Sequence, residues 1–303
     1  MAIISGQMAK LFDARVGKAF FGNLKLYPEE YAQWCDKRPT KEQYERDAMF
    51  GEFPMPNLVG EYENAPETHF SPGPQRTWTP VKYAVTLIAS EEIIEDERFP
   101  VVVKSAGALG TAMRHRYETQ GAYDLNNSFT VSTVGAADTA DETLCAKAHA
   151  SFGDGSDQAN RPATDVTLGV DSLWAAVVNF HGLNDREDNP IMKIPNKLVF
   201  GPTLERRAIE ILRSDAGVPY LSTNEMNAIR SKNLGYSIGH YIDSVTAWWV
   251  TTAEKSIRFY VRRAPTVKAE STIRNDSRSW TISTRISHGP MDWYDIYGTD
   301  GVA

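Results

Sequence analysis

Residues 90–127 read SEEIIEDERFPVVVKSAGALGTAMRHRYETQGAYDLNN, and most of this stretch predicts one long helix. Its apolar residues recur at spacings of three and four, the period that lines up one face of a helix. They are Val102, Ala106, Leu109, Met113 and Tyr117. Gly107 and Gly110 each cost a free-standing helix about 1 kcal/mol relative to alanine. Their presence predicts that another backbone crosses the helix closely at this point.

Pro100 divides this stretch, because proline lacks an N–H and clashes with the turn before it. Proline suits the first position of a helix, so we expect the long helix to begin near Pro100 and a short acidic helix to precede it. Ser90 is expected to cap the short helix, and the acidic residues that follow lie at the positive end of its dipole. The long helix then serves as a spine for the surrounding structure.

The composition is that of a globular protein with a substantial core. The chain has 303 residues, one large or two ordinary domains, and 42% of them are hydrophobic. It has no apolar run of roughly eighteen residues, the length that spans a membrane. The start, MAIISGQMAKLFDARVGKAF, lacks the pattern of a secretion signal, so we expect the protein to be made and kept in a cytosol. Cys35 and Cys145 lack metal-ligand spacing and predict buried reduced thiols.

The charge is acidic overall but unevenly placed. A net charge of −7 argues against a dedicated nucleic-acid binder, which carries a basic excess. Residues 91–97 are strongly acidic, whereas most of the charged residues in the range 255–285 are basic. The basic residues are Lys255, Arg258, Arg262, Arg263, Lys268, Arg274, Arg278 and Arg285. Two interpretations stay open: two solvated faces, or an acidic and a basic surface that meet between copies of the chain.

The first 50 residues predict an arm rather than a domain, because their apolar patches are too scattered to build a core alone. These patches contain Ile3, Ile4, Leu11, Phe12, Phe20 and Phe21. A small helix is expected over residues 28–34. Residues 51–80 are rich in proline and predict an extended, two-stranded excursion that turns near residues 64–74. A strand over residues 81–89 leads into the spine helix.

The second half of the chain predicts a mixture of helices and antiparallel strands. A helix is expected over residues 171–181, capped by Asp171 and stopped by Gly182. The polar residues 185–189 then form a plausible domain boundary. Further expected elements are a strand at 197–200, a helix at 204–212, a strand at 241–251, and paired strands around 257–262 and 280–286. The fold class is therefore α+β, without a βαβ series or an internal repeat.

One stretch matches a catalytic motif. Residues 235–239, GYSIG, fit the GxSxG nucleophile elbow of hydrolases, and Asp243 and His288 follow Ser237 in the triad order. The elbow requires a buried strand before the serine and a helix after it, and the sequence predicts neither. A glycine-bounded turn is therefore favoured. No phosphate loop, dinucleotide motif or histidine pattern for a metal is present, so we expect no catalytic, cofactor-binding or metal-binding residues.

The order of the segments resembles the Hong-Kong-97-type major capsid protein of tailed bacteriophages, and more narrowly the Mu-like major head subunit group. The resemblance covers about residues 76–303. It rests on residues 83–98, 108–116, 124–129, 145–149, 195–212 and 242–249, which occur in the family's order. Each motif alone is weak, and their succession makes the match specific.

The resemblance implies a domain map. Residues 1–50 are the N-terminal arm and residues 51–89 the E-loop hairpin, which reaches over a neighbouring subunit. Residues 90–190 form the peripheral domain around the spine helix. Residues 191–255 form the axial domain, and residues 256–303 return to the peripheral domain as strands. On this map the apolar patches of the arm are buried on other copies.

The resemblance also implies function. The chain is expected to be a structural protein, not an enzyme, that assembles as hexamers and pentamers into an icosahedral shell around double-stranded phage DNA in the host bacterial cytoplasm. Its expected partners are itself, a portal protein, a separate scaffold and a decoration protein, with non-specific contacts to packaged DNA, for example through Arg114 and Arg116, and none to a membrane. We hypothesise that residues 91–97 meet a basic surface from residues 258–278 of an adjacent subunit.

Two features depart from some relatives. Lys82 is the single lysine between Lys41 and Lys104, and it lies at the base of the expected E-loop, so no lysine crosslink between subunits is predicted. The chain begins with a short arm, so cleavage of an N-terminal scaffolding segment is not expected. Two alternative functions are an encapsulin-type compartment for a cargo enzyme and a serine hydrolase that uses Ser237.

Overall fold

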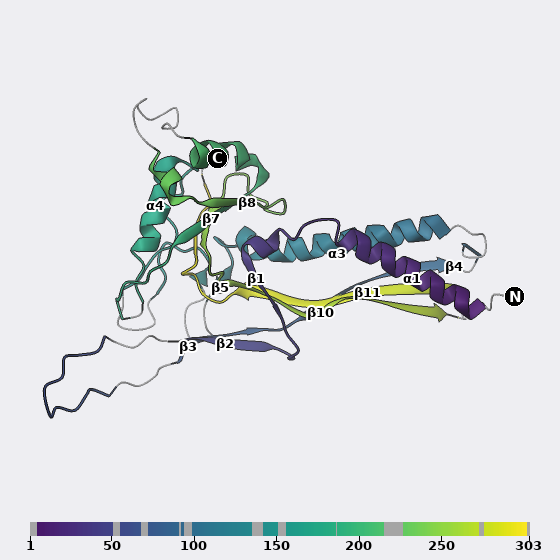
Figure 1. The fold of residues 1–303 in the computed structure, drawn as a ribbon, viewed down its shortest axis with the longest axis horizontal. Coiled ribbons are helices and arrows are strands. Elements are labelled where there is room, and N and C mark those ends of the chain that lie inside the picture. The colour runs from purple at the N-terminus through teal and green to yellow at the C-terminus, as the bar shows by residue number, and fades with distance from the viewer. Residues whose placement is uncertain are drawn as a thin grey trace.

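The structure is a computed structural model. It describes residues 5–50, 55–67, 72–90, 92–93, 99–134, 142–150, 156–185, 187–214, 227–272 and 276–301. Two parts stand out in Figure 1: an elongated body, in which two helices lie along a long sheet, and a compact lobe at one end of it.

The spine helix is α3 (Phe99–Asn126), which confirms the predicted start near Pro100. The predicted apolar face is buried: Val102, Ala106, Met113 and Tyr117 are each at most 5% exposed, and Leu109 packs against them. Of the short acidic helix expected before it, Glu92 and Ile93 are helical, and residues 94–98 lie outside the described residues.

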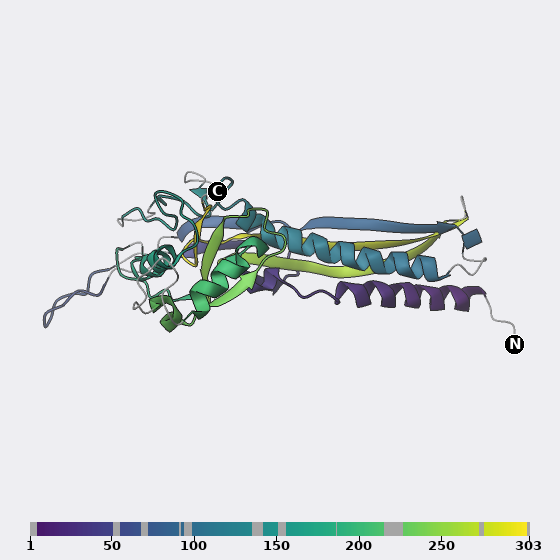
Figure 2. The same ribbon diagram turned by 90° about the horizontal axis from the view of Figure 1, so that it is seen from above.

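The predicted backbone crossing is made by α1 (Ser5–Leu24), which runs alongside α3 in the same direction (Figures 1 and 2). A Cβ at Gly110 would overlap the carbonyl oxygen of Phe20, and one at Gly107 would lie 2.6 Å from the Asn23 side chain. Gly110 therefore allows α1 to approach α3 to backbone contact, and Gly107 leaves room for the Asn23 side chain.

The expectation that the N-terminal apolar patches are buried on other copies is wrong for α1. Phe12, Val16 and Phe20 are at most 2% exposed within the same chain. Phe12 and Val16 pack with Val102, Ala106 and Trp280. The three residues are spaced by four, so they form one helical face that covers the subunit's own core.

The body contains a four-stranded sheet in the order β1-β10-β11-β4. Its strands are β1 (Cys35–Pro39), β10 (Ile257–Thr272), β11 (Ser277–Pro290) and β4 (Val81–Ser90). The predicted strand before the spine helix and the predicted antiparallel pair β10–β11 are confirmed. Side chains alternate across the sheet: Phe259 packs among Tyr31 and Tyr117 on the helical face, whereas Tyr260 contacts Trp78 on the other.

A hairpin lies on the sheet face opposite the helices (Figure 1). Its strands are β2 (Glu45–Phe50) and β3 (Pro72–Trp78), which pair in antiparallel fashion. The hairpin confirms a two-stranded excursion, but the expected turn at residues 64–74 is wrong because Pro72 already begins β3. In the described segment 55–67 the chain turns at residues 60–63, where the Glu63 N–H donates to the Gly60 carbonyl at 3.2 Å.

The lobe is built on a second sheet in the order β12-β9-β7-β8. Its strands are β12 (Ile296–Thr299), β9 (Trp248–Thr252), β7 (Pro195–Phe200) and β8 (Gly235–Ile238). The helical elements are α4 (Val170–His181), α5 (Glu205–Arg213) and the 3-10 turns η1 (Tyr31–Gln33), η2 (Pro202–Leu204) and η3 (Ala228–Lys232), of which η1 belongs to the body. Two short strands, β5 (Ser132–Val134) and β6 (Glu142–Thr143), pair with each other between the spine and the lobe.

Several local predictions about the lobe are corrected. The strand expected at 241–251 begins only at Trp248, because residues 239–247 form turns. Gly169, not Asp171, is the N-cap of α4, and the Gly169 N–H donates to the Ser172 hydroxyl at 2.8 Å. Gly182 ends α4 as predicted.

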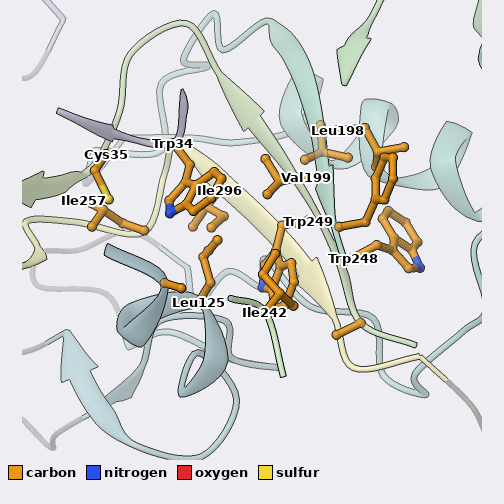
Figure 3. Packing of buried hydrophobic residues seen from close by; sticks show 14 of the residues in the cluster. Trp34, Cys35, Leu125, Leu198, Val199, Ile242, Trp248, Trp249, Ile257 and Ile296 are labelled. Atoms are coloured by element: carbon orange, nitrogen blue, oxygen red, sulfur yellow. The ribbon is translucent and has the colours of Figure 1, made fainter. Parts of the chain in front are cut away.

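One apolar core joins the lobe to the spine. In Figure 3, Trp248 and Trp249 of β9 lie beside Leu198 and Val199 of β7, while Leu125 of α3 approaches from the other side. Cys35 and Cys145 are both free and fully buried, which confirms the predicted buried thiols, and burial raises the pKa of each. None of the helices in the described part of the chain has the length and apolar character needed to cross a membrane.

The close packing of α1 on α3 gives a stability prediction. Gly110→Ala should lower the free energy of unfolding by about 1–3 kcal/mol, because the new methyl group must displace the α1 backbone. Gly17 is the matched control on α1, since a Cβ there meets nothing within 4 Å. Gly17→Ala should raise stability by about 0.5–1 kcal/mol through helix propensity. Chemical denaturation of the subunit measures both, and equal effects at the two glycines would contradict the packing account.

Candidate assembly surfaces

The structure does not bring the hydrolase-like residues together. Ser237 lies in strand β8, which pairs in parallel with β7, and not at a sharp strand-to-helix turn. His288, in β11, bonds to Asp124 at 2.8 Å from its Nδ1 and to Gln120 at 3.2 Å from its Nε2. The Asp243 backbone and side chain bond to Asn126 of the spine. The GYSIG stretch is thus a strand of the lobe, neither an elbow nor the favoured glycine-bounded turn.

A charged cleft between the lobe and the body sheet contains ion pairs. Lys193 contacts Glu254 at 2.7 Å and Asp295 at 2.8 Å. These residues line a polar cleft of about 560 Å³ together with Asp292 and Arg258. Burial, with the nearby charge of Asp295, raises the pKa of Asp292 to about 7. Among the described residues no group of three or more His, Cys, Asp or Glu side chains could hold a metal ion.

The end of the hairpin is the first surface suited to contact another molecule. Leu58 and Tyr62 are fully exposed, and Met55 is 68% exposed. The described segment 55–67 contains no helix or strand, and its polar contacts are local, such as the bond from the Gly60 N–H to Glu63 at 2.9 Å. Exposed aromatic and aliphatic side chains on a projecting segment are typical of a binding surface.

Strand β4 is a second such surface, and sequence reasoning did not identify it. It is the edge strand of the body sheet, and within the described chain no strand pairs with its outer side. Val81, Val85 and Ile88 are 55%, 38% and 63% exposed along it. A long edge strand with apolar side chains and unpaired backbone groups is a template for contact with another chain.

A buried ionic network joins the arm segment to the spine. Arg114 contacts Glu29 at 3.0 Å, and its guanidinium donates to the Leu24 carbonyl at 2.9 Å. Glu118 accepts from the backbone N–H groups of Tyr31 at 3.0 Å and Glu30 at 3.3 Å. Arg114 is therefore committed within the subunit, and the expectation that it touches DNA is wrong.

The same junction reaches the lobe. His240 bonds to Glu30 at 2.6 Å, and the Asn126 side chain donates to the Tyr241 carbonyl at 2.9 Å. Burial raises the pKa of Glu118 to about 7, against the lowering effect of its backbone donors. The orientation of the lobe on the spine thus depends on polar contacts from residues 29–30, 118 and 240.

Some basic residues of the long strands form ion pairs within the subunit. Arg258 pairs with Asp36 at 2.8 Å, and Arg278 pairs with Asp13 of α1 at 2.6 Å. Asp13 also accepts from the Trp280 indole at 2.8 Å. These two arginines are therefore not part of the basic surface that was hypothesised to meet residues 91–97 of a neighbouring subunit. Most of residues 91–97 lie outside the described part of the chain.

The architecture is that of shell-forming capsid subunits of the Hong-Kong-97 type. It is similar to "virus-like particle from Pyrococcus furiosus", with a TM-score of 0.57 and 9% identity over 94% of this chain and 98% of that chain. It is similar to the chain of Microbacterium phage Oxtober96, with a TM-score of 0.54 and 16% identity over 90% and 92%. It is also similar to a chain of the procapsid of bacteriophage JBD30, with a TM-score of 0.51 and 13% identity over 99% and 77%.

The family follows from the sequence match. The model of the family described as "Phage capsid protein" matches residues 75–298, so the chain belongs to that family. No curated protein matches the sequence. The chain is a phage major capsid protein, the subunit of an icosahedral shell and a component of the virion, and its role is structural rather than enzymatic. The α+β fold expected from the resemblance is confirmed.

The buried carboxyl at the junction predicts a pH dependence. The pKa of Glu118 is raised from 4.5 to about 7 in the folded chain, so the folded state binds the extra proton between these values. Stability contributed by this group is therefore lost as the pH rises through that window. The Glu118→Gln variant should therefore lose less stability as the pH rises. At about pH 8 its free energy of unfolding should exceed that of the wild type by about 1–3 kcal/mol. Thermal unfolding across pH measures this, with the exposed Glu61→Gln as control, and an unchanged pH slope in Glu118→Gln would refute the assignment.

Proposed function

We propose that this chain assembles as hexamers and pentamers and that the resulting shell encloses double-stranded phage DNA. The observation that carries the proposal is the hairpin of β2, β3 and residues 55–67. Its end exposes Leu58 and Tyr62 completely, and the subunit's own core lies elsewhere. Heterologous contacts of this kind, between different surfaces of identical subunits, close into rings.

The domain map fits this assembly with three changes of boundary. We propose residues 1–44 as the arm, including α1 docked on the spine, and residues 45–89 as the E-loop, because its first strand starts at Glu45. The peripheral domain holds α3 and the strands β10 and β11. The axial domain was expected at 191–255. We extend it to α4 and β12, because Leu173, Val177 and Phe180 of α4 share the core of the lobe and β12 pairs with β9.

The finer assignments are extensions of the family membership. We propose that the chain belongs to the Mu-like major head subunit group, on the motifs in residues 83–98, 145–149 and 195–212. A portal protein, a separate scaffold and a decoration protein are its proposed partners, and assembly takes place in the host bacterial cytoplasm. Lys82 lies in β4 and not on the projecting segment, which supports a shell without lysine crosslinks.

An encapsulin-type compartment is the second candidate. The similarity to the virus-like particle from Pyrococcus furiosus, which covers 94% of this chain, supports this second candidate. The match to the phage capsid family favours the DNA-filled shell. The two differ in content: nuclease-protected DNA in particles from infected cells supports the phage head, whereas a protein cargo without DNA supports the compartment.

Assembly of the expressed protein tests the proposal directly. Negative-stain electron microscopy with size-exclusion chromatography should show closed shells, or hexamers and pentamers that close when protein concentration or salt is raised. The same measurement with a phage scaffold protein covers the case in which a scaffold is needed. A subunit that stays monomeric under all these conditions would refute the proposal.

The hairpin end should matter for assembly and not for folding. The double variant Leu58→Ser, Tyr62→Ser should unfold within about 0.5 kcal/mol of the wild type, because both side chains are solvated in the subunit. It should nevertheless fail to form shells in the microscopy assay. Leu26→Ser is the matched control, since Leu26 is 68% exposed but lies on the body. Normal shells from the double variant would show that the hairpin end is not a subunit contact.

A further inference from the structure

The two long helices of the body present mainly positive charge to solvent. Their acidic residues with described side chains are Asp13, Glu118 and Asp124, and each is engaged within the subunit. Asp13 pairs with Arg278, Glu118 accepts from the Tyr31 and Glu30 N–H groups, and Asp124 bonds to His288. Glu118 and Asp124 are also buried, at 3% and 2% exposed.

The basic residues of the same layer point outward. Arg15, Lys18 and Lys25 are exposed along α1 and its last turn, and Lys104 is exposed on α3. Spacings of three and seven place the first three on one side of the helix, over about 15 Å. None of the four forms an ion pair with another described residue. We call these four residues the basic stripe.

The stripe borders a groove between the helices. Arg15 and Lys18 line it from α1, and Pro100 and Val103 line it from α3, with a volume of about 490 Å³. Lys104 follows Val103 directly. Ala19 and Gly22 also line the groove, so small residues lie beside the cationic side chains. A surface of this kind can follow a continuous polyanion without a shape-specific pocket.

The described end of the hairpin, on the other side of the sheet, carries acidic residues and no basic residue. The hairpin lies across the sheet from the helices (Figure 1), and its segment 55–67 exposes Glu61, Glu63 and Glu67. The chain as a whole carries −7. The positive charge of the helical layer is therefore a local reversal in an acidic protein. A closed shell has one face toward its lumen and one toward solvent, and the basic helical layer and the acidic hairpin end lie on opposite sides of the body sheet.

We infer that the layer of α1 and α3 is the lumenal face of the shell and that the basic stripe binds phosphates of the packaged duplex. This inference rests on the proposed function as a DNA-filled shell. Duplex DNA carries about one negative charge per 1.7 Å, so a row of lysine and arginine side chains releases counterions when it contacts the backbone. Four contacts per subunit in an otherwise acidic wall give weak, sequence-independent binding. Of the arginines first considered for DNA contact, Arg114 is buried and Arg116 stacks over Tyr83 at 4.9 Å.

The test measures binding of a short fluorescent DNA duplex to unassembled subunits across a range of salt. The stripe variant carries Arg15→Gln, Lys18→Gln, Lys25→Gln and Lys104→Gln. It should bind about tenfold or more weakly at low salt, and the slope of log K against log salt should fall by about 3–4, at about 0.9 per lost contact. The charge-matched control carries Lys147→Gln, Arg206→Gln, Lys232→Gln and Lys268→Gln, all exposed and outside α1 and α3. It should keep the wild-type slope.

Electron microscopy of the same proteins separates the possible outcomes. Normal shells from a stripe variant that has lost DNA binding support the inference. Unchanged DNA binding by the stripe variant, equal loss in the control, or no binding by the wild type at low salt overturns it. Failure of the stripe variant alone to form shells also overturns it, because the stripe then binds another subunit. Absence of shells from the wild type contradicts the proposed function, and the binding data remain a separate result.

Discussion

The approach of α1 to α3 at Gly107 and Gly110 is the contact on which the body depends. Because Gly110 lacks a Cβ, the two helices meet backbone to backbone there, and Gly107 leaves room for the Asn23 side chain, so that the helices form one layer along the long sheet. Phe12, Val16 and Phe20 are then removed from water, at roughly 1.5–3 kcal/mol for each side chain. The same position of α1 brings Asp13 within reach of Arg278 and Trp280 on β11. Packing and ion pairing thus fix α1 on its own subunit, although the first 50 residues resemble a free arm in sequence.

The spine has a different role in each half of its length. Its first half packs against α1 and the sheet, where side chains are apolar or small. Its second half carries Arg114, Glu118 and Asp124, which are buried and bonded to the arm segment and the sheet. Buried ion pairs add little net stability compared with well-packed apolar groups at the same positions. They nevertheless fix orientation, because leaving one buried charge unpaired is costly. The lobe therefore sits on a junction that is defined by specific polar contacts as well as by the apolar core around Trp249 and Leu125.

Strong periodicity made the spine helix, β4 and the β10–β11 pair predictable, because one buried face leaves a regular pattern in sequence. The same logic was available for α1, whose Phe12, Val16 and Phe20 are spaced by four. Gly17 and Gly22 interrupt that pattern and suggested an irregular arm, yet both face open space and their cost is outweighed by packing. The hairpin turn was misplaced because the expected range 64–74 includes Pro72, and proline is tolerated at the first residue of a strand, where Pro72 lies. The edge character of β4 depends on strand order, which a single sequence does not determine.

The candidate contact surfaces were predictable only in part, for a related reason. A residue such as Leu58 or Tyr62 can be placed on a loop from sequence, but its full exposure follows from where the hairpin projects. The charge of the helical layer is even less visible in the sequence. Asp13 and Glu118 lie close to basic residues along the chain, so their charges cancel when they are counted along the sequence. In three dimensions Glu118 is buried and hydrogen-bonded, Asp13 is paired with Arg278, and the cations remain exposed. Separation of charge by face lets an acidic subunit remain soluble and still offer a polyanion a cationic surface, which net charge alone argues against.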